Sequence, residues 1–272
     1  MAIERTELSD QLLYGIDFKA RIIHFGVELD SSNEDPSAFT GASVEMAIRA
    51  IQKMVSEAPH KPIELHVSSY GGDAYAALRL HDEILACSAQ IRFYGGGAIM
   101  SAASIIMAAC DERYLHVNSR VMIHELSTSV DGRHSDLKID SKENEAIHST
   151  MCDIYAANSR LPKEFWLDIM SKDLYMSAAE AVSIGLCDFI IEPKKRGNLR
   201  KKRQVQMKKE VDLKKLVKDL YDRTGRSRVP RIELNAVIKE PSDSSVVIDS
   251  TPMETKMPEF PAQLIPNIEK VE

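Results

Sequence analysis

The chain has 272 residues, of which 44% are hydrophobic and 28% are charged, and its formal net charge is −6. This length and composition are typical of a globular protein whose single large core needs no disulfide bonds. They exclude a membrane-spanning protein, because no apolar stretch approaches the roughly 20 residues that a transmembrane helix requires. Since the first residues also lack the apolar core of a signal peptide, we expect a cytoplasmic protein without membrane contact.

The first two thirds of the chain alternate between strand and helix patterns, joined by short glycine-containing turns. This alternation predicts an α/β domain with largely parallel strands. The expected strands cover residues 21–29, 62–69, 90–94, 112–117, 121–124 and 187–191. The expected helices cover residues 43–58, 74–86, 135–158, 162–171 and 177–184, and a further apolar helix begins directly after Ser101.

The helix expected over residues 135–158 is too long and too polar for a routine core helix, so we expect it to project or to pack against a partner. The four cysteines lie among apolar residues with neither C-x-x-C spacing nor a metal-ligand pattern. We therefore expect reduced core thiols and no metal site. The four are Cys87, Cys110, Cys152 and Cys187.

Charge changes abruptly near Pro193. Residues 194–231 hold 16 Lys and Arg but 4 Asp and Glu, a local charge of +12. We therefore divide the chain into a folded domain (1–193), a basic extension (194–231) with a helix over 211–221, and a proline-rich, disordered tail (232–272). The extension fits a solvated segment, a docking segment for a polyanion or a cleavable tail, but no nucleic-acid-binding signature supports a nucleic-acid partner.

Two residues are candidates for nucleophilic catalysis. Ser101 follows three glycines and begins an apolar helical run, so it lies where free backbone N–H groups favour negative charge. His124 ends a predicted strand 23 residues later and is a candidate base. The pair indicates acyl transfer, although Ile99 and Ala103 occupy the positions that the G-x-S-x-G motif reserves for glycine.

A second glycine pair supplies a candidate anion site. Gly71 and Gly72 follow a predicted strand and open a helix, so a backbone N–H there can approach a substrate carbonyl without obstruction by a Cβ atom. A tight turn that requires positive φ is the alternative explanation, and it stays open for Gly71.

Over about residues 15–192 the chain resembles the family of the Clp protease proteolytic subunit, a self-compartmentalising serine peptidase. The family's strand leading to Ser-Pro-Gly-Gly is matched by Ser68–Gly72, and its nucleophile segment Gly-Gln-Ala-Ala-Ser-Met-Gly-Ala aligns with Gly97–Ser104. Its Pro-Asn-Ser-Arg-Val-Met-Ile-His segment is nearly intact at Val117–His124. A further block, Ser177–Asp188, matches the family's capping-box helix and last turn.

The resemblance assigns roles to residues of this chain. Ser101 is the nucleophile, His124 is the general base and then acid, and Asp173, just before a strand-like step, orients the imidazole. The backbone N–H groups of Gly72 and Ala102 form the oxyanion hole. Asp168 is an alternative orienting acid, although its place in a predicted helix is more simply a solvated face.

The resemblance also implies a fold and partners. The fold would be a crotonase-like (Clp protease-like) α/β spiral of strand-strand-helix units with a projecting handle helix. The subunit would form a homo-oligomer of stacked rings around a chamber, take polypeptide substrates from an ATP-dependent unfoldase, and bind no cofactor; no Walker A pattern occurs in the sequence. Alternatives are a viral capsid-maturation protease of the same fold, a catalytically silent ring subunit and a crotonase-type acyl-CoA enzyme.

Overall fold

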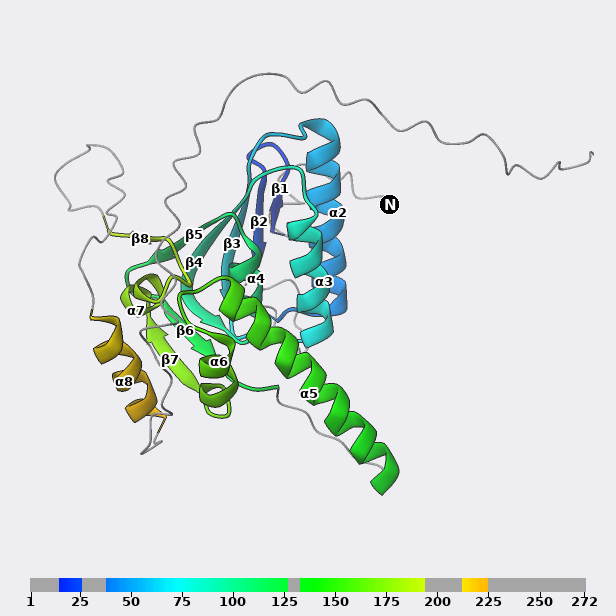
Figure 1. Ribbon diagram of the computed structural model, residues 1–272. Helices are drawn as coiled ribbons and strands as arrows, with labels where there is room; N and C mark the ends of the chain where they lie inside the picture. The colour runs from blue at the N-terminus through cyan, green and yellow to red at the C-terminus, as the bar shows by residue number, and fades with distance from the viewer. Residues whose placement is uncertain (1–14, 26–37, 127–132, 194–211, 225–272) are drawn as a thin grey trace, which may run out of the picture. The chain divides into compact units, whose positions relative to one another are not determined.

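The protein is described by a computed structural model for residues 15–25, 38–126, 133–193 and 212–224. A mixed sheet of eight strands is flanked by helices (Figure 1). The strands are β1 (Ile16–Asp17), β2 (Ile22–Phe25), β3 (Ile63–Ser69), β4 (Ile91–Met100), β5 (Glu112–His116), β6 (Arg120–Ile123), β7 (Leu174–Ser177) and β8 (Phe189–Ile191). The helices are α2 (Gly41–Glu57), α3 (Ala74–Leu85), α4 (Ala102–Ala109), α5 (His134–Ala157), α6 (Lys163–Ile169), α7 (Ala178–Ser183) and α8 (Leu213–Arg223).

The central strands are parallel, as the alternation of strand and helix predicted. They lie in the order β2-β3-β4-β5-β8, while β1 joins the edge of the sheet antiparallel to β2. β6 pairs with β4 in parallel and with β7 in antiparallel orientation. The six predicted strands are confirmed with shifted ends, except that residues 26–29 of the first lie outside the described residues.

Strand register is visible in a ladder of neighbouring rings on one face of the sheet, stacked except for the tilted pair of His24 and His66. Each ring lies opposite the next on neighbouring strands, with centroid separations between 4.8 and 5.0 Å. Because side chains alternate between faces, the adjacent residues Phe25, Val67, Leu115 and Ile190 point into the core. The ladder consists of His24, His66, Tyr94, Tyr114 and Phe189.

β4 is longer than predicted: the sequence pattern indicated a strand that ends at Tyr94. The strand continues through the glycines to Met100 and changes its neighbour on the way. Residues 92–95 pair with β5, whereas residues 98–100 pair with β6. The glycine run therefore lies inside a strand, at the point where its partner changes.

The predicted helices are confirmed within a few residues of their expected ends. α3 packs against α2 and α4, and α5 packs against α4 and α6. The N-terminal part of α5 extends away from the sheet, and its Ile139 side chain is 66% exposed (Figure 1). None of the helices in the described part of the chain is long and apolar enough to cross a membrane.

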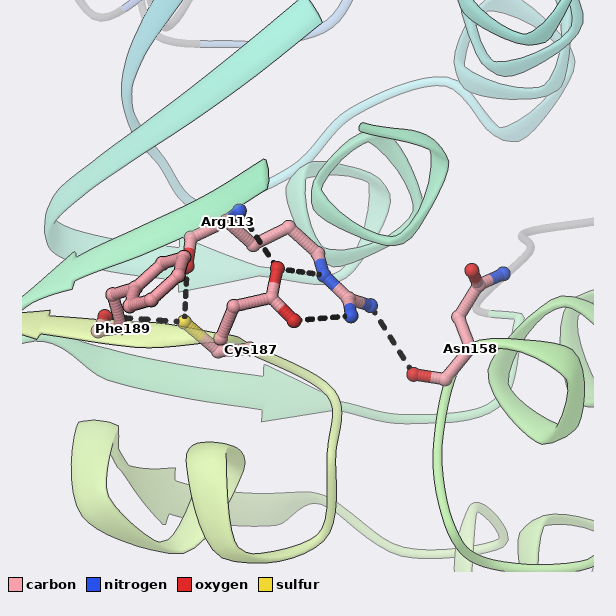
Figure 2. Close-up of polar contacts among 5 residues, drawn as sticks. Arg113, Asn158, Cys187 and Phe189 are labelled. Atoms are coloured by element: carbon pink, nitrogen blue, oxygen red, sulfur yellow. Dashed lines mark hydrogen bonds and ion pairs between the residues drawn. The ribbon is translucent and has the colours of Figure 1, made fainter. Parts of the chain in front are cut away.

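Arg113 on β5 ties together segments that are distant in the sequence (Figure 2). Its guanidinium donates to both carboxylate oxygens of Asp188, over 2.7 and 2.9 Å, and to the backbone carbonyl of Asn158 over 3.2 Å. Burial alone would lower the pKa of Arg113, but the bond with Asp188 outweighs burial and raises it. These hydrogen bonds from one guanidinium group hold the start of β8 and the end of α5 against β5.

α8 is the helix predicted in the basic extension, and it packs on the folded domain. Leu216, Val217, Leu220 and Tyr221 are buried in the same core cluster as α6 and α7. Tyr221 meets Phe165 edge to face, with ring centroids 5.4 Å apart. A domain boundary at Pro193 stays a prediction, and the proposed tail (232–272) lies outside the described residues.

Candidate active site

Ser101 lies at the junction where β4 ends and α4 begins. Its backbone has φ 51° and ψ −122°, and among the described non-glycine residues only Arg21 also has a positive φ. The Ser101 N–H donates to the carbonyl of Met122 on the neighbouring strand over 2.8 Å. Backbone strain of this kind is concentrated at functional sites, and a serine on a tight strand-to-helix turn presents its hydroxyl clear of the sheet.

His124 directly follows β6, the strand that pairs with the end of β4. Met100 lies opposite Met122 in this parallel pair, so the residues that follow both strands emerge at the same edge of the sheet. His124 Nε2 lies 2.8 Å from Ser101 Oγ, within hydrogen-bonding distance. The two candidates that sequence analysis singled out are therefore in contact.

Asp173 reaches the same place through β7. Leu174 lies opposite Ile123 in the antiparallel β6–β7 pair, which puts Asp173 beside His124. Asp173 Oδ1 is 3.9 Å from His124 Nδ1, too far for a hydrogen bond but within reach of an ion pair with a protonated imidazole. The Asp173 side chain is 58% exposed, whereas the His124 side chain is 23% exposed.

The glycine pair packs directly against the candidate nucleophile. Gly71 has φ +118°, and a Cβ atom there would lie 2.7 Å from the Cβ atom of Ser101. Gly72 has φ +154°, and a Cβ atom there would lie 2.5 Å from the backbone nitrogen of Phe39. Gly71 therefore has the positive φ of the tight-turn explanation, and an approach of this segment to a substrate carbonyl stays a prediction.

Ser101 and His124 open into a small pocket of about 120 Å³. Gly72 and Ala102, the two expected oxyanion donors, both contribute to its wall. The remaining wall residues are Ala74, Ile105, Glu125, Leu126 and Met151.

Part of this wall was not predicted from the sequence. Ile105 lies four residues after Ser101 on α4, so helical spacing could have placed it on the same face. Met151 comes from α5, fifty residues away, and no local signal marks it. Asp168, the alternative acid, lies half-buried on α6. Among the side chains that the structure describes, no group of three His, Cys, Asp or Glu could hold a metal ion.

Comparison with known proteins gives a consistent result. A family model described as Clp protease matches residues 37–194. The chain is 32% identical over 166 residues to a protein of Deinococcus radiodurans named ATP-dependent Clp protease proteolytic subunit, covering 58% of this chain and 81% of the relative. It is 28% identical over 185 residues to ATP-dependent Clp protease proteolytic subunit 2 of Chlamydia muridarum, covering 67% of this chain and 86% of the relative.

The family model covers more than half of the chain, including Ser101, His124 and Asp173. The mixed α/β sheet with its helices fits the crotonase-like fold expected from the sequence. The resemblance noted from the motifs is confirmed, and the chain belongs to the Clp protease family, a family of peptidases.

Proposed function

We propose that this chain is a serine endopeptidase subunit in which Ser101, His124 and Asp173 form the catalytic triad. The observation that carries the proposal is the contact of 2.8 Å between Ser101 Oγ and His124 Nε2, at a serine with positive φ. A hydroxyl that donates to an imidazole nitrogen is the arrangement from which a serine nucleophile is activated.

The proposed mechanism requires one tautomer of His124. If His124 Nε2 accepts the Ser101 hydroxyl proton, the imidazole carries its own proton on Nδ1, the atom that faces Asp173. Ser101 Oγ then attacks the peptide carbonyl carbon while its proton passes to Nε2. The carboxylate of Asp173, 3.9 Å from Nδ1, stabilises the resulting imidazolium by charge attraction.

The negative charge of the tetrahedral intermediate falls on the former carbonyl oxygen. The N–H groups of Gly72 and Ala102 serve as its donors, supported by their common place in the pocket wall. When the intermediate collapses, His124 returns the proton to the leaving amine, and water later hydrolyses the acyl-enzyme by the same path. Loss of one such donor typically costs about 2.7–4 kcal/mol of transition-state stabilisation.

A fluorophosphonate probe tests this function, because it reacts covalently with activated serines. We expect the wild-type protein to be labelled and Ser101→Ala and His124→Ala to lose labelling, with melting temperatures near that of wild type. Cleavage of short fluorogenic peptides should be lost in parallel. Labelling of wild type that persists in Ser101→Ala contradicts the proposed nucleophile.

The subunit is further proposed to work in the cytoplasm as a homo-oligomer of stacked rings, fed by an ATP-dependent unfoldase. The family and the two relatives, whose names include "ATP-dependent" and "proteolytic subunit", support this assembly. Native mass spectrometry should give a mass that is a large multiple of 30.4 kDa. A monomeric or dimeric mass under conditions where peptides are cleaved excludes the chamber.

A further inference from the structure

Two buried hydroxyl groups form a chain that ends on the backbone of Ser101: Tyr155 bonds to Ser104, and Ser104 bonds to the Ser101 carbonyl. Ser104 on α4 and Tyr155 on α5 are both 0% exposed, and their side-chain oxygens are 2.7 Å apart. Ser104 Oγ also lies 2.6 Å from the carbonyl oxygen of Ser101, which accepts a second bond of 2.9 Å from the Ser104 N–H. The three residues form a continuous chain of hydrogen bonds.

The direction of this chain is fixed by chemistry. The Ser101 carbonyl can only accept, so the single hydroxyl proton of Ser104 points toward it. Ser104 Oγ can then only accept from Tyr155, whose hydroxyl is the donor at the start of the chain. Burial raises the pKa of Tyr155 well above its ordinary value, so this donor keeps its proton. Hydrogen bonds arranged in series in this way polarise one another.

The chain ends on the peptide group that also carries the expected oxyanion donor. The carbonyl of Ser101 and the N–H of Ala102 belong to one planar trans peptide, so they point in opposite directions. Fixing the carbonyl toward Ser104 fixes the Ala102 N–H on the opposite side. Ala102 is also in the wall of the pocket beside Ser101. Bonds accepted by the carbonyl also make the N–H of the same peptide a stronger donor.

We propose that Ser104 and Tyr155 are positioning residues that orient and polarise the Ala102 N–H for the oxyanion. This inference rests on the proposed peptidase function, since the two residues would support the oxyanion hole of that site. A serine inside a helix often bonds to the carbonyl three or four residues earlier with no functional role. Here, the bonded carbonyl belongs to the residue with positive φ, and a buried tyrosine from another helix directs the serine proton.

The test uses Ser104→Ala and Tyr155→Phe in the full chain, each of which removes one oxygen atom with little change in shape. Ser119→Ala is the matched control, because Ser119 is 1% exposed and its hydroxyl donates to the Gly95 carbonyl over 3.0 Å. The readouts are kcat and KM for a short fluorogenic peptide, the rate of fluorophosphonate labelling, the pH dependence of kcat and the melting temperature.

Since removal of a whole oxyanion donor costs about 10²–10³ in kcat, a weakened donor should cost about tenfold in Ser104→Ala and somewhat less in Tyr155→Phe. KM and the midpoint of the pH profile should stay near their wild-type values, because ground-state binding and His124 are unchanged. The double variant should be no slower than Ser104→Ala alone, since both act through one chain of bonds. Ser119→Ala should keep the wild-type kcat.

Wild-type kcat in Ser104→Ala and Tyr155→Phe, with labelling of Ser101 intact, overturns the inference and leaves the proposed function standing. The inference is also overturned if Ser119→Ala loses as much kcat and as much melting temperature as Ser104→Ala and Tyr155→Phe. The loss of kcat would then reflect general stability. If the wild-type protein itself is not labelled and cleaves no peptide, the proposed function fails and this inference fails with it.

Discussion

Asp173 has the loosest geometry of the three proposed triad residues, with 3.9 Å between its carboxylate and His124 Nδ1. Removal of a triad acid while its shape is kept can lower kcat by about 10⁴, because the histidine adopts the wrong tautomer. We expect Asp173→Asn to lower kcat by about 10²–10⁴ with little change in melting temperature, since the side chain is exposed. Steady-state peptide hydrolysis measures this.

Asp168→Asn is the matched variant, because Asp168 was the other acid considered and lies on α6. It should retain most of the wild-type kcat. If Asp168→Asn is the slower of the two variants, then the orienting acid is Asp168 and the assignment of Asp173 is wrong.

Gly72 allows a second test at the residue scale. A Cβ atom there would lie 2.4–2.8 Å from backbone atoms of Phe39, so Gly72→Ala must displace one of the two segments. We expect a loss of stability of about 1–3 kcal/mol together with a large loss of kcat, because the displaced N–H is a proposed oxyanion donor. Urea unfolding and peptide hydrolysis measure the two effects.

Gly96→Ala is the control for this substitution. A Cβ atom at Gly96 would approach no atom closer than 3.5 Å, and its φ is not positive. It should have near-wild-type stability and kcat. Equal losses of stability and kcat in Gly72→Ala and Gly96→Ala would show that any added methyl group in this region is harmful. The proposed role of the Gly72 N–H would then be unsupported.

Residue types and motifs were enough to single out Ser101, His124 and Asp173, and the structure places them side by side. The sequence did not reveal the φ of 51° at Ser101. Positive φ is normally indicated by a glycine at the position itself, and position 101 holds a serine. The Ser101 N–H bonds to Met122 on β6, a tertiary contact that no local sequence pattern indicates.

At the scale of elements, α7 and α8 are joined by a pH-sensitive contact. Arg223 on α8 lies 2.6 Å from Glu180, whose other carboxylate oxygen caps α7 through Ser177. Partial burial alone would raise the pKa of Glu180, but the bonds from Arg223 and Ser177 outweigh it and lower the pKa from 4.5 to about 2. Folding therefore favours the ionised carboxylate.

A carboxylate with a lowered pKa stabilises the fold fully above its unfolded pKa of 4.5, and this contribution is lost as the pH falls toward about 2. Glu180→Gln should therefore be less stable than wild type at pH 7, and the difference should shrink between pH 4.5 and pH 2. Denaturant unfolding of both proteins across this range measures it. A difference that stays constant with pH would mean that packing, and not ionisation, is responsible.

Element types followed well from hydrophobic periodicity, and the capping box at Ser177 marked the start of α7 correctly. The end of β4 did not follow, because glycines ordinarily end a strand pattern. That segment is held in the sheet by β6, which lies later in the chain. The short strand β1 was not predicted, because two residues are too few to show an alternation of buried and exposed side chains.

At the scale of the whole molecule, α8 makes part of the basic extension an integral piece of the folded domain. We expect a chain that ends at residue 193 to be several kcal/mol less stable than one that ends at residue 224, because it loses the burial of four apolar side chains on α8. The cost of ordering the helix offsets part of this burial. Urea unfolding of the two chains measures the difference.

A chain that ends at residue 224 is itself the control for the charge and length of the remaining tail. It should match the full chain in stability. Equal unfolding midpoints for the chains that end at 193 and at 224 would mean that α8 contributes nothing to the fold. The charge pattern indicated a change of composition near Pro193. It could not predict that the apolar face of α8 packs against the core of the domain.

The pairing of β7 has a consequence for how the site opens. Among the described strands β7 pairs with β6 alone, whereas β6 lies between β4 and β7. Edge segments open locally at a lower free-energy cost than central ones, so β7 amides should exchange with solvent before those of β6. Local opening of β7 would then separate Asp173 from His124 while Ser101 and His124 stay in contact. The site would thus consist of an inner pair held by the parallel strands β4 and β6 and an acid, directly before the edge strand, that is lost first.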